Sequence, residues 1–206
     1  MKINKDEIVS YFNELYPNAH CELNYDSLFH LLIAVMLSAQ TTDISVNKVT
    51  PVLFEKYPEP KDLMNANLEE VENIIKSIGL YKNKAKNIIL TSKILEEKHN
   101  GVVPNNFDEL TLLPGVGRKT ANVVLVEGFK IPAFPVDTHV ERVAKRLGIA
   151  KKKDTVEEVE RKIKKIYPSN LYGILHHQFI FFGRYFCKAI KPNCQDCRFL
   201  NRCFKK

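Results

Sequence analysis

Apolar residues recur along most of this chain every three or four positions, a spacing that places them on one face of an α-helix. The apolar segments are separated by residues typical of helix ends, with side-chain caps before the first turn and glycine or proline after the last. No long stretch alternates apolar and polar positions, so no β-strand is predicted. The pattern predicts an all-α fold with helices at residues 6–16, 28–38, 43–57, 67–79, 81–101, 106–112, 118–128, 138–148, 155–168 and 171–190.

Several of these segments have distinctive compositions or capping residues in addition to the helical spacing. Residues 28–38 are apolar nearly all round, which is typical of a helix buried at the centre of a domain. Gly79 stands where a helix needs a C-terminal cap. Thr138 and Glu141 have the spacing of a capping box, which would leave Asp137 free to face a cleft, although Asp137 could equally be an ordinary N-cap.

Two features of the pattern bear on domain organisation. Residues 131–136 contain Pro132 and Pro135, so they are expected to form an extended crossing between two lobes. Residues 79–85 faintly echo residues 115–121, because each begins with a glycine turn followed by a basic residue and an alanine. No true internal repeat is present.

Charge then narrows the class of partner. The 206 residues include 31 Lys and Arg against 24 Asp and Glu, a net charge of +7 that favours a polyphosphate partner. No leader peptide opens the chain, and its longest uncharged apolar run, residues 31–38, is too short to cross a bilayer. We therefore expect an intracellular protein that binds no membrane.

Four of the five cysteines lie within the last twenty residues, with the spacing C-x6-C-x2-C-x5-C. An odd cysteine count argues against a complete disulfide framework, and four thiolates so close together indicate a metal site. Spacing alone leaves both zinc and an iron–sulfur cluster open, with two adjacent disulfides as the alternative without metal. The four candidate ligands are Cys187, Cys194, Cys197 and Cys203.

A glycine turn at residues 112–121, Leu-Leu-Pro-Gly-Val-Gly-Arg-Lys-Thr-Ala, opens onto an apolar helix. Gly115 and Gly117 remove side chains that would block a phosphate, and the helix start that follows attracts anions. A plain structural turn would look the same. Lys119 is out of place for stability, since a cation in the first turn of a helix costs about 0.3–1 kcal/mol. This misfit makes Lys119 a candidate for chemistry.

Residues 113–124 resemble the helix-hairpin-helix signature of DNA glycosylases, specifically the endonuclease III family. Val136-Asp137-Thr138-His139-Val140, residues 37–43 (Leu-Ser-Ala-Gln-Thr-Thr-Asp) and the cysteine tail match further segments of that family in the same order. The resemblance spans nearly the whole chain. It implies a two-lobed fold, with a central helical domain at 22–132, the hairpin at about 108–127, and a second lobe from 1–21 and 133–206 that carries an iron–sulfur loop at 187–203.

The same resemblance implies a function and its residues. The protein would be a bifunctional DNA glycosylase and abasic-site lyase that removes oxidised pyrimidines from duplex DNA, with Lys119 as nucleophile, Asp137 as catalytic carboxylate and a [4Fe-4S] cluster on the four cysteines. We expect a monomer located in the cytoplasm with the nucleoid. The residues expected to contact DNA are Gln40, Leu80, Gly115, Val116, Gly117, Arg118, His139 and Lys191.

Two alternatives stay open at this point. A monofunctional adenine glycosylase would share the hairpin and the cluster, but Lys119 and a chain that ends just after Cys203 count against it. A DNA-binding or damage-sensing module without catalysis would bind DNA and form no covalent adduct. A further expectation is that Lys188, Lys191, Arg198, Arg202, Lys205 and Lys206 give the cysteine loop a basic surface.

Overall fold

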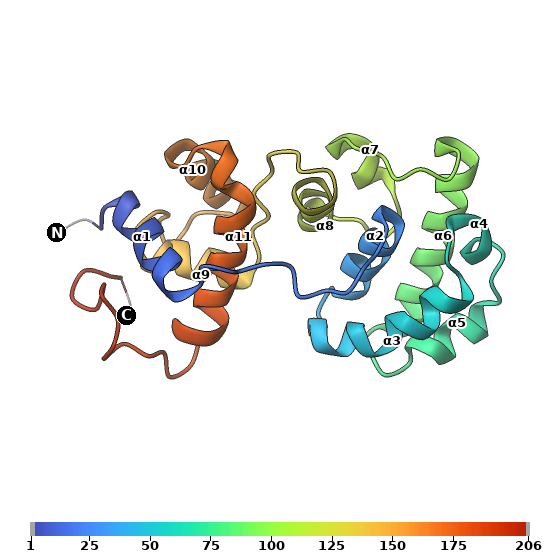
Figure 1. The fold of residues 1–206 in the computed structure, drawn as a ribbon, viewed down its shortest axis with the longest axis horizontal. Helices are drawn as coiled ribbons and strands as arrows, with labels where there is room; N and C mark the ends of the chain where they lie inside the picture. The colour runs from blue at the N-terminus through green and yellow to red at the C-terminus, as the bar shows by residue number, and fades with distance from the viewer. Residues whose placement is uncertain (1–2, 205–206) are drawn as a thin grey trace. The chain divides into compact units, whose positions relative to one another are not determined.

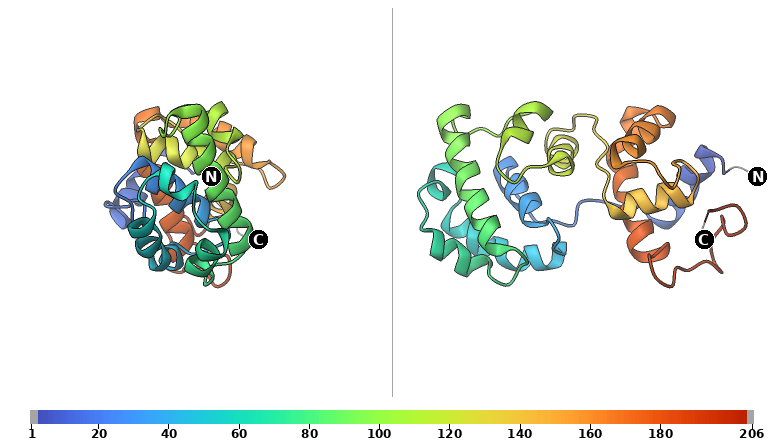
Figure 2. Two further views of the ribbon diagram at one scale, coloured as in Figure 1. Left: turned by 90° about the vertical axis from the view of Figure 1, so that its right-hand side faces the viewer. Right: turned by 180° about the vertical axis from the view of Figure 1, so that it is seen from behind.

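The computed structural model describes residues 3–204, and its regular structure over that range is entirely helical, as the sequence predicted (Figures 1 and 2). The chain divides into two compact units. One is Glu22–Phe129, and the other joins the residues before Glu22 to those after Phe129. The domain bounds of 22–132, 1–21 and 133–206 stay a prediction, since a compact set of contacts need not fold independently.

The unit Glu22–Phe129 is organised around helix α2 (Figure 1). Residues 29–37 of α2 are all buried, which confirms the central helix expected from its apolar sequence. The helix contacts α3, α6, α8 and the π-helical turn η1. The elements are α2 (Leu28–Leu37), α3 (Asp43–Lys56), α4 (Pro60–Leu63), α5 (Leu68–Ile75), α6 (Tyr81–His99), α7 (Phe107–Leu112), α8 (Arg118–Val123) and η1 (Val124–Gly128).

The second unit packs the first helix of the chain against its last ones. Phe12 and Phe179 are fully buried, with their ring centroids 5.0 Å apart in edge-to-face packing. Phe199 lies within residues 187–203, the cysteine segment, and it is also fully buried and belongs to the same core. The elements are α1 (Lys5–Leu15), α9 (Thr138–Arg146), α10 (Val156–Ile166), the 3-10 turn η2 (Ser169–Leu171), α11 (Tyr172–Phe181) and the π-helical turn η3 (Phe182–Phe186).

Within residues 3–204, each of the ten predicted helices is present, and the helices differ from the predictions mainly at their ends. The sequence did not predict the short elements α4 and η2. The helix predicted over 171–190 ends at Phe186, and the carbonyl groups of Cys187, Lys188 and Ala189 beyond it accept hydrogen bonds from Arg146. Residues 131–136 adopt no helix, as their prolines predicted.

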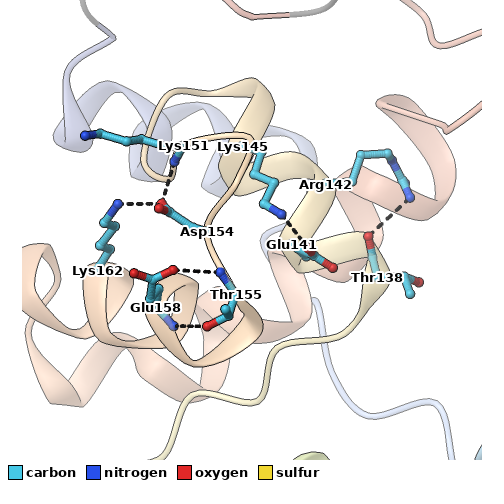
Figure 3. Close-up of polar contacts among 9 residues, drawn as sticks. All are labelled: Thr138, Glu141, Arg142, Lys145, Lys151, Asp154, Thr155, Glu158 and Lys162. Carbon is cyan, nitrogen blue, oxygen red and sulfur yellow. Dashed lines mark hydrogen bonds and ion pairs between the residues drawn. The ribbon is translucent and has the colours of Figure 1, made fainter.

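The predicted ranges 67–79, 106–112 and 155–168 each begin with a good capping residue, and the structure uses all three residues as N-caps. Asn67, Asn106 and Thr155 each accept a hydrogen bond from the third backbone N–H of the helix that follows. Figure 3 shows the capping box of Thr155 and Glu158. The prediction for Gly79 was wrong. Helix α5 ends at Ile75, and the left-handed residue is Leu80, with φ 59°.

Two further expectations from the sequence concern the C-terminal lysines and membrane-spanning helices. Lys205 and Lys206 lie outside the described residues. Across residues 3–204, no helix combines the length and the apolar composition that crossing a membrane requires.

Candidate active site

The glycine turn between α7 and α8 is held by hydrogen bonds to its own backbone. Val116 donates its N–H to the carbonyl oxygen of Leu113 at 3.1 Å, and Thr91 Oγ1 donates to the carbonyl oxygen of Pro114 at 3.0 Å. Gly115 has φ 79°. Gly117 is the N-cap of α8, and no side chain caps that helix. The first turn of α8 therefore presents N–H groups that no side chain caps.

The two glycines of this turn are constrained differently. A Cβ on Gly115 would lie 2.7 Å from Asn87 Nδ2, in addition to the strain of a left-handed backbone. A Cβ on Gly117 would meet no atom within 4 Å. Packing within the protein thus explains Gly115, whereas Gly117 leaves an open surface where another molecule can approach the backbone.

Lys119 lies in the first turn of α8 and is exposed. The residues that follow it, 120–126, are all buried. The guanidinium of Arg118 lies over the ring of Phe107, 5.1 Å from its centroid. A rigid buried helix therefore presents the amine of Lys119 to solvent at the end of the glycine turn.

Gln40 and Leu80 occupy two loops of the same unit that contact each other. Both residues are exposed, and both have left-handed backbone conformations, with φ 54° and 59°. A Cβ on Gly79 would lie 3.8 Å from the carbonyl oxygen of Gln40, which is ordinary van der Waals distance. The structure thus brings these two predicted DNA contacts together.

In the other unit, Asp137 is the N-cap of α9. Its Oδ1 accepts the backbone N–H groups of His139 at 2.9 Å and of Val140 at 2.8 Å. The expected capping box of Thr138 and Glu141 is therefore wrong. Glu141 instead pairs with Lys145, one turn along the helix, at 2.5 Å (Figure 3). The helix start fixes the Asp137 carboxylate in place and favours its negative charge.

His139 is half-buried beside this cap. Burial lowers the pKa of His139, and the positive charges of Arg142 and Arg184 act in the same direction, while Asp137 opposes them. Its Nδ1 lies 3.3 Å from a guanidinium nitrogen of Arg142. The imidazole is therefore neutral at neutral pH, so it can offer a hydrogen bond but little charge.

The four C-terminal cysteines line one small apolar cavity. Leu147, Phe182, Phe186 and Leu200 are among the other residues that line it, and Arg146 donates to Cys187 Sγ at 3.3 Å. In the described part of the chain, no disulfide joins any of the five cysteines, and no group of three potential ligands is arranged to hold a metal ion. Their common cavity and their chemistry nevertheless suit a group that binds four thiolates.

Besides the buried Phe199, two ion pairs anchor the cysteine segment. Arg202 forms a bidentate ion pair with Glu7 at 2.5 and 2.9 Å, and Arg198 pairs with Glu14 at 2.6 Å. These two arginines thus hold the segment onto α1, so the expectation that they face phosphate is not supported. Lys191 is exposed, with a left-handed backbone at φ 48°.

A family model describes most of this structure. Residues 33–169 match the model for the HhH-GPD superfamily of base excision DNA repair proteins. The chain is 53% identical to endonuclease III of Bacillus subtilis over 190 residues, which cover 92% of this chain and 87% of the relative. It is 48% identical to the Escherichia coli K12 enzyme over 196 residues, or 95% and 92% of the two chains. The chain belongs to the endonuclease III family.

Solved structures agree with this assignment. The chain matches a trapped endonuclease III–DNA covalent intermediate with a TM-score of 0.94 and 53% identity, over 98% of this chain and 96% of the other. A thermostable thymine-DNA glycosylase matches with a TM-score of 0.82 at 23% identity, which shows the shared fold alone. Endonuclease III proteins are DNA glycosylases and abasic-site lyases of base excision repair.

Sequence reasoning missed two features of this member of the endonuclease III family. Arg142 and Arg146 on α9 donate to backbone carbonyl groups of residues 183–189 and so position the start of the cysteine segment. Lys84 on α6 is buried, although lysines of a helix usually lie on its solvated face. The echo of residues 115–121 in 79–85 was the only available signal for Lys84, which aligns with the buried Thr120.

Proposed function

We propose that this protein removes oxidised pyrimidines from duplex DNA and then cuts the strand on the 3′ side of the abasic site, with Lys119 as the nucleophile. The observation that carries the proposal is the exposed amine of Lys119 at the end of an open glycine turn. The likeness to a chain trapped as a covalent DNA intermediate supports it. The lesion must leave the base stack, because its sugar carbon is inaccessible within the duplex.

The proposed chemistry begins with the neutral amine of Lys119. Its Nζ forms a bond to C1′ of the damaged nucleotide, and the N-glycosidic bond breaks, so that the base leaves with the electron pair and takes up a proton. The sugar ring then opens to a Schiff base. Loss of a proton from C2′ expels the 3′ phosphate by β-elimination, and water releases the lysine.

Asp137 is proposed to stabilise the positive charge that develops on the sugar and to move protons during the reaction. Two backbone N–H groups hold one of its oxygens, so the carboxylate cannot swing away as charge develops. Fixed charges of this kind stabilise a transition state because they need no reorganisation when the reaction occurs.

DNA contact is proposed for the remaining predicted residues. The turn residues Gly115, Val116, Gly117 and Arg118 would bind the phosphate backbone through N–H groups and charge, without reading sequence. Gln40 would fill the space left by the extruded nucleotide, and Leu80 would wedge near the opposite base. His139 and Lys191 would contact the backbone in the other unit. A DNA substrate also supports the predicted cytoplasmic, nucleoid-associated location.

The two glycines allow DNA binding to be separated from stability. Gly117→Ala should leave the free energy of unfolding within about 0.5–1 kcal/mol of the wild type, since its Cβ meets open space, while DNA affinity falls because a methyl group blocks the backbone. Gly115→Ala should lower the stability by more, since it adds left-handed strain and a clash with Asn87. Denaturant titration and DNA-binding isotherms measure both effects. Unchanged affinity in Gly117→Ala would contradict the phosphate role.

A [4Fe-4S] cluster on Cys187, Cys194, Cys197 and Cys203 is the proposed cofactor. When bound, it would cross-link the four sulfurs and fix the shape of the cysteine loop, with no step of base excision assigned to it. The shared apolar cavity supports this assignment. Purified protein should be brown and contain iron and sulfide in equal amounts. Colourless protein with zinc would contradict the cluster.

Borohydride reduction tests the proposed function directly. A duplex with one oxidised pyrimidine should give a covalent protein–DNA complex with borohydride, and a strand cut 3′ to the lesion without it. An undamaged duplex of the same sequence is the control. Base release without a covalent complex would instead indicate a monofunctional glycosylase. Binding with neither product would indicate a DNA-binding module.

A further inference from the structure

Lys84 differs from its neighbours on α6 because it is buried. Only 7% of its surface is exposed, whereas Lys82 and Lys86 are exposed. Its Nζ donates to the carbonyl oxygen of Leu37 at 2.9 Å and to Thr41 Oγ1 at 2.7 Å. Both acceptors are neutral, and burial lowers the pKa of Lys84. Such a costly placement for a lysine indicates a specific role.

The side chain of Lys84 binds both ends of the loop that carries Gln40. Leu37 is the last residue of α2, where a cation is favoured by the helix dipole and satisfies a carbonyl group that the helix leaves free. Thr41 directly follows Gln40 and donates its own backbone N–H to Ser38 at 3.0 Å. One ammonium group thus closes residues 37–41 into a fixed loop.

The backbone of Lys84 binds the second loop. Its N–H donates to the carbonyl oxygen of Leu80 at 3.0 Å, which forms the first turn of α6. Leu80 and Gln40 both hold left-handed backbones, which cost roughly 1–2 kcal/mol each for residues other than glycine. Such conformations persist only where the surroundings fix them. Lys84 is bonded to both loops in which they occur.

We propose that Lys84 is a positioning residue for opening duplex DNA. It holds the Gln40 loop (residues 37–41) and the turn at Leu80 in one fixed arrangement, and these two segments are called the prongs below. The proposal rests on the DNA-contacting roles proposed above for Gln40 and Leu80. A rigid pair of prongs can fill the vacated space and hold the opposite base at the same time, because the separation of the prongs is set before DNA binds. Without the ammonium group, the Gln40 loop is free to relax out of its left-handed conformation.

The test compares Lys84→Met, which keeps the length of the side chain and removes its donors, with Lys86→Met as the matched control on the same helix. On a duplex with an oxidised pyrimidine, Lys84→Met should lose about 10- to 100-fold in kcat/KM, in line with the loss of a charge-assisted hydrogen bond. On a single-stranded oligonucleotide with an abasic site, which needs no opening, its lyase rate should stay within about twofold. Lys86→Met should match the wild type on both substrates.

A second readout follows DNA opening without chemistry. The fluorescence of 2-aminopurine placed next to the lesion increases when the base unstacks, and this increase should be smaller with Lys84→Met than with the wild type. Thr41→Val removes only one acceptor of the ammonium group and should show the same substrate preference with a smaller loss. If Lys84→Met fails to fold, Thr41→Val alone tests the proposal.

A double-mutant cycle separates positioning from general damage. If Lys84 acts through the prongs, Lys84→Met should cost little more in protein that already carries Gln40→Ala and Leu80→Ala. Equal losses on duplex and single-stranded substrates, full additivity, or no loss in Lys84→Met would each overturn the proposal. If Gln40→Ala and Leu80→Ala leave duplex activity unchanged, the prong roles proposed above are themselves wrong.

Discussion

Lys119→Ala is expected to abolish the covalent borohydride adduct and to lower the rate of base excision by at least about 10³-fold. The reason is chemical, since no other group is proposed to form the bond to C1′. The stability of the protein, in contrast, should increase. Removing a cation from the first turn of α8 relieves an unfavourable helix-dipole interaction, so the free energy of unfolding should increase by about 0.3–1 kcal/mol.

Three measurements check this result: adduct yield on gels, single-turnover excision rates and denaturant unfolding. Lys165→Ala is the control, because Lys165 is an exposed lysine in the last turn of α10 and has no proposed role in DNA chemistry. An adduct yield in Lys119→Ala equal to that of the wild type would remove Lys119 from its role. Lost activity accompanied by lost stability would point to a structural cause instead.

Asp137→Asn should lower the excision rate by about 10²- to 10³-fold while the protein stays folded. Asparagine caps helices as well as aspartate does, so its side-chain oxygen can still accept the N–H groups of His139 and Val140. The substitution therefore removes the charge and keeps the cap. The free energy of unfolding should fall by no more than about 1 kcal/mol, the size of a charge–dipole interaction.

Asp137→Ala removes charge and cap together. It should lose at least as much activity as Asp137→Asn, and in addition about 0.5–2 kcal/mol of stability. Single-turnover rates and unfolding curves of both variants separate the two roles. If Asp137→Asn keeps full activity and only Asp137→Ala loses it, the carboxylate is an N-cap without a catalytic charge.

Features that depend on residues close together in the chain could be predicted from the sequence. The caps at Asn67, Asn106 and Thr155 depend on residues three positions apart, and the buried α2 follows from an uninterrupted apolar run. The position of Lys119 in the first turn of a helix follows from the glycine turn directly before it. These patterns are local, so the physical chemistry that produces them acts within one or two turns of chain.

Competition between local alternatives was harder to predict. Both Asp137 and Thr138 are good capping residues, and the sequence left open a capping box of Thr138 with Glu141 or an N-cap at Asp137. In the structure, Asp137 caps α9 and Glu141 pairs with Lys145. Similarly, Leu80 rather than Gly79 takes the left-handed conformation. Each choice depends on how the flanking segments enter the fold.

By itself, the sequence determined the all-helical class, the family, and the candidate groups for chemistry and for cluster binding. Only the tertiary structure decided which charged residues bind other segments of the protein. Arg198 and Arg202 turn to α1, Arg146 holds the start of the cysteine loop, and Lys84 is buried against the end of α2. The physical reason is that a helical period identifies the apolar face of a helix, whereas the burial of a charge depends on acceptors that other segments bring to it.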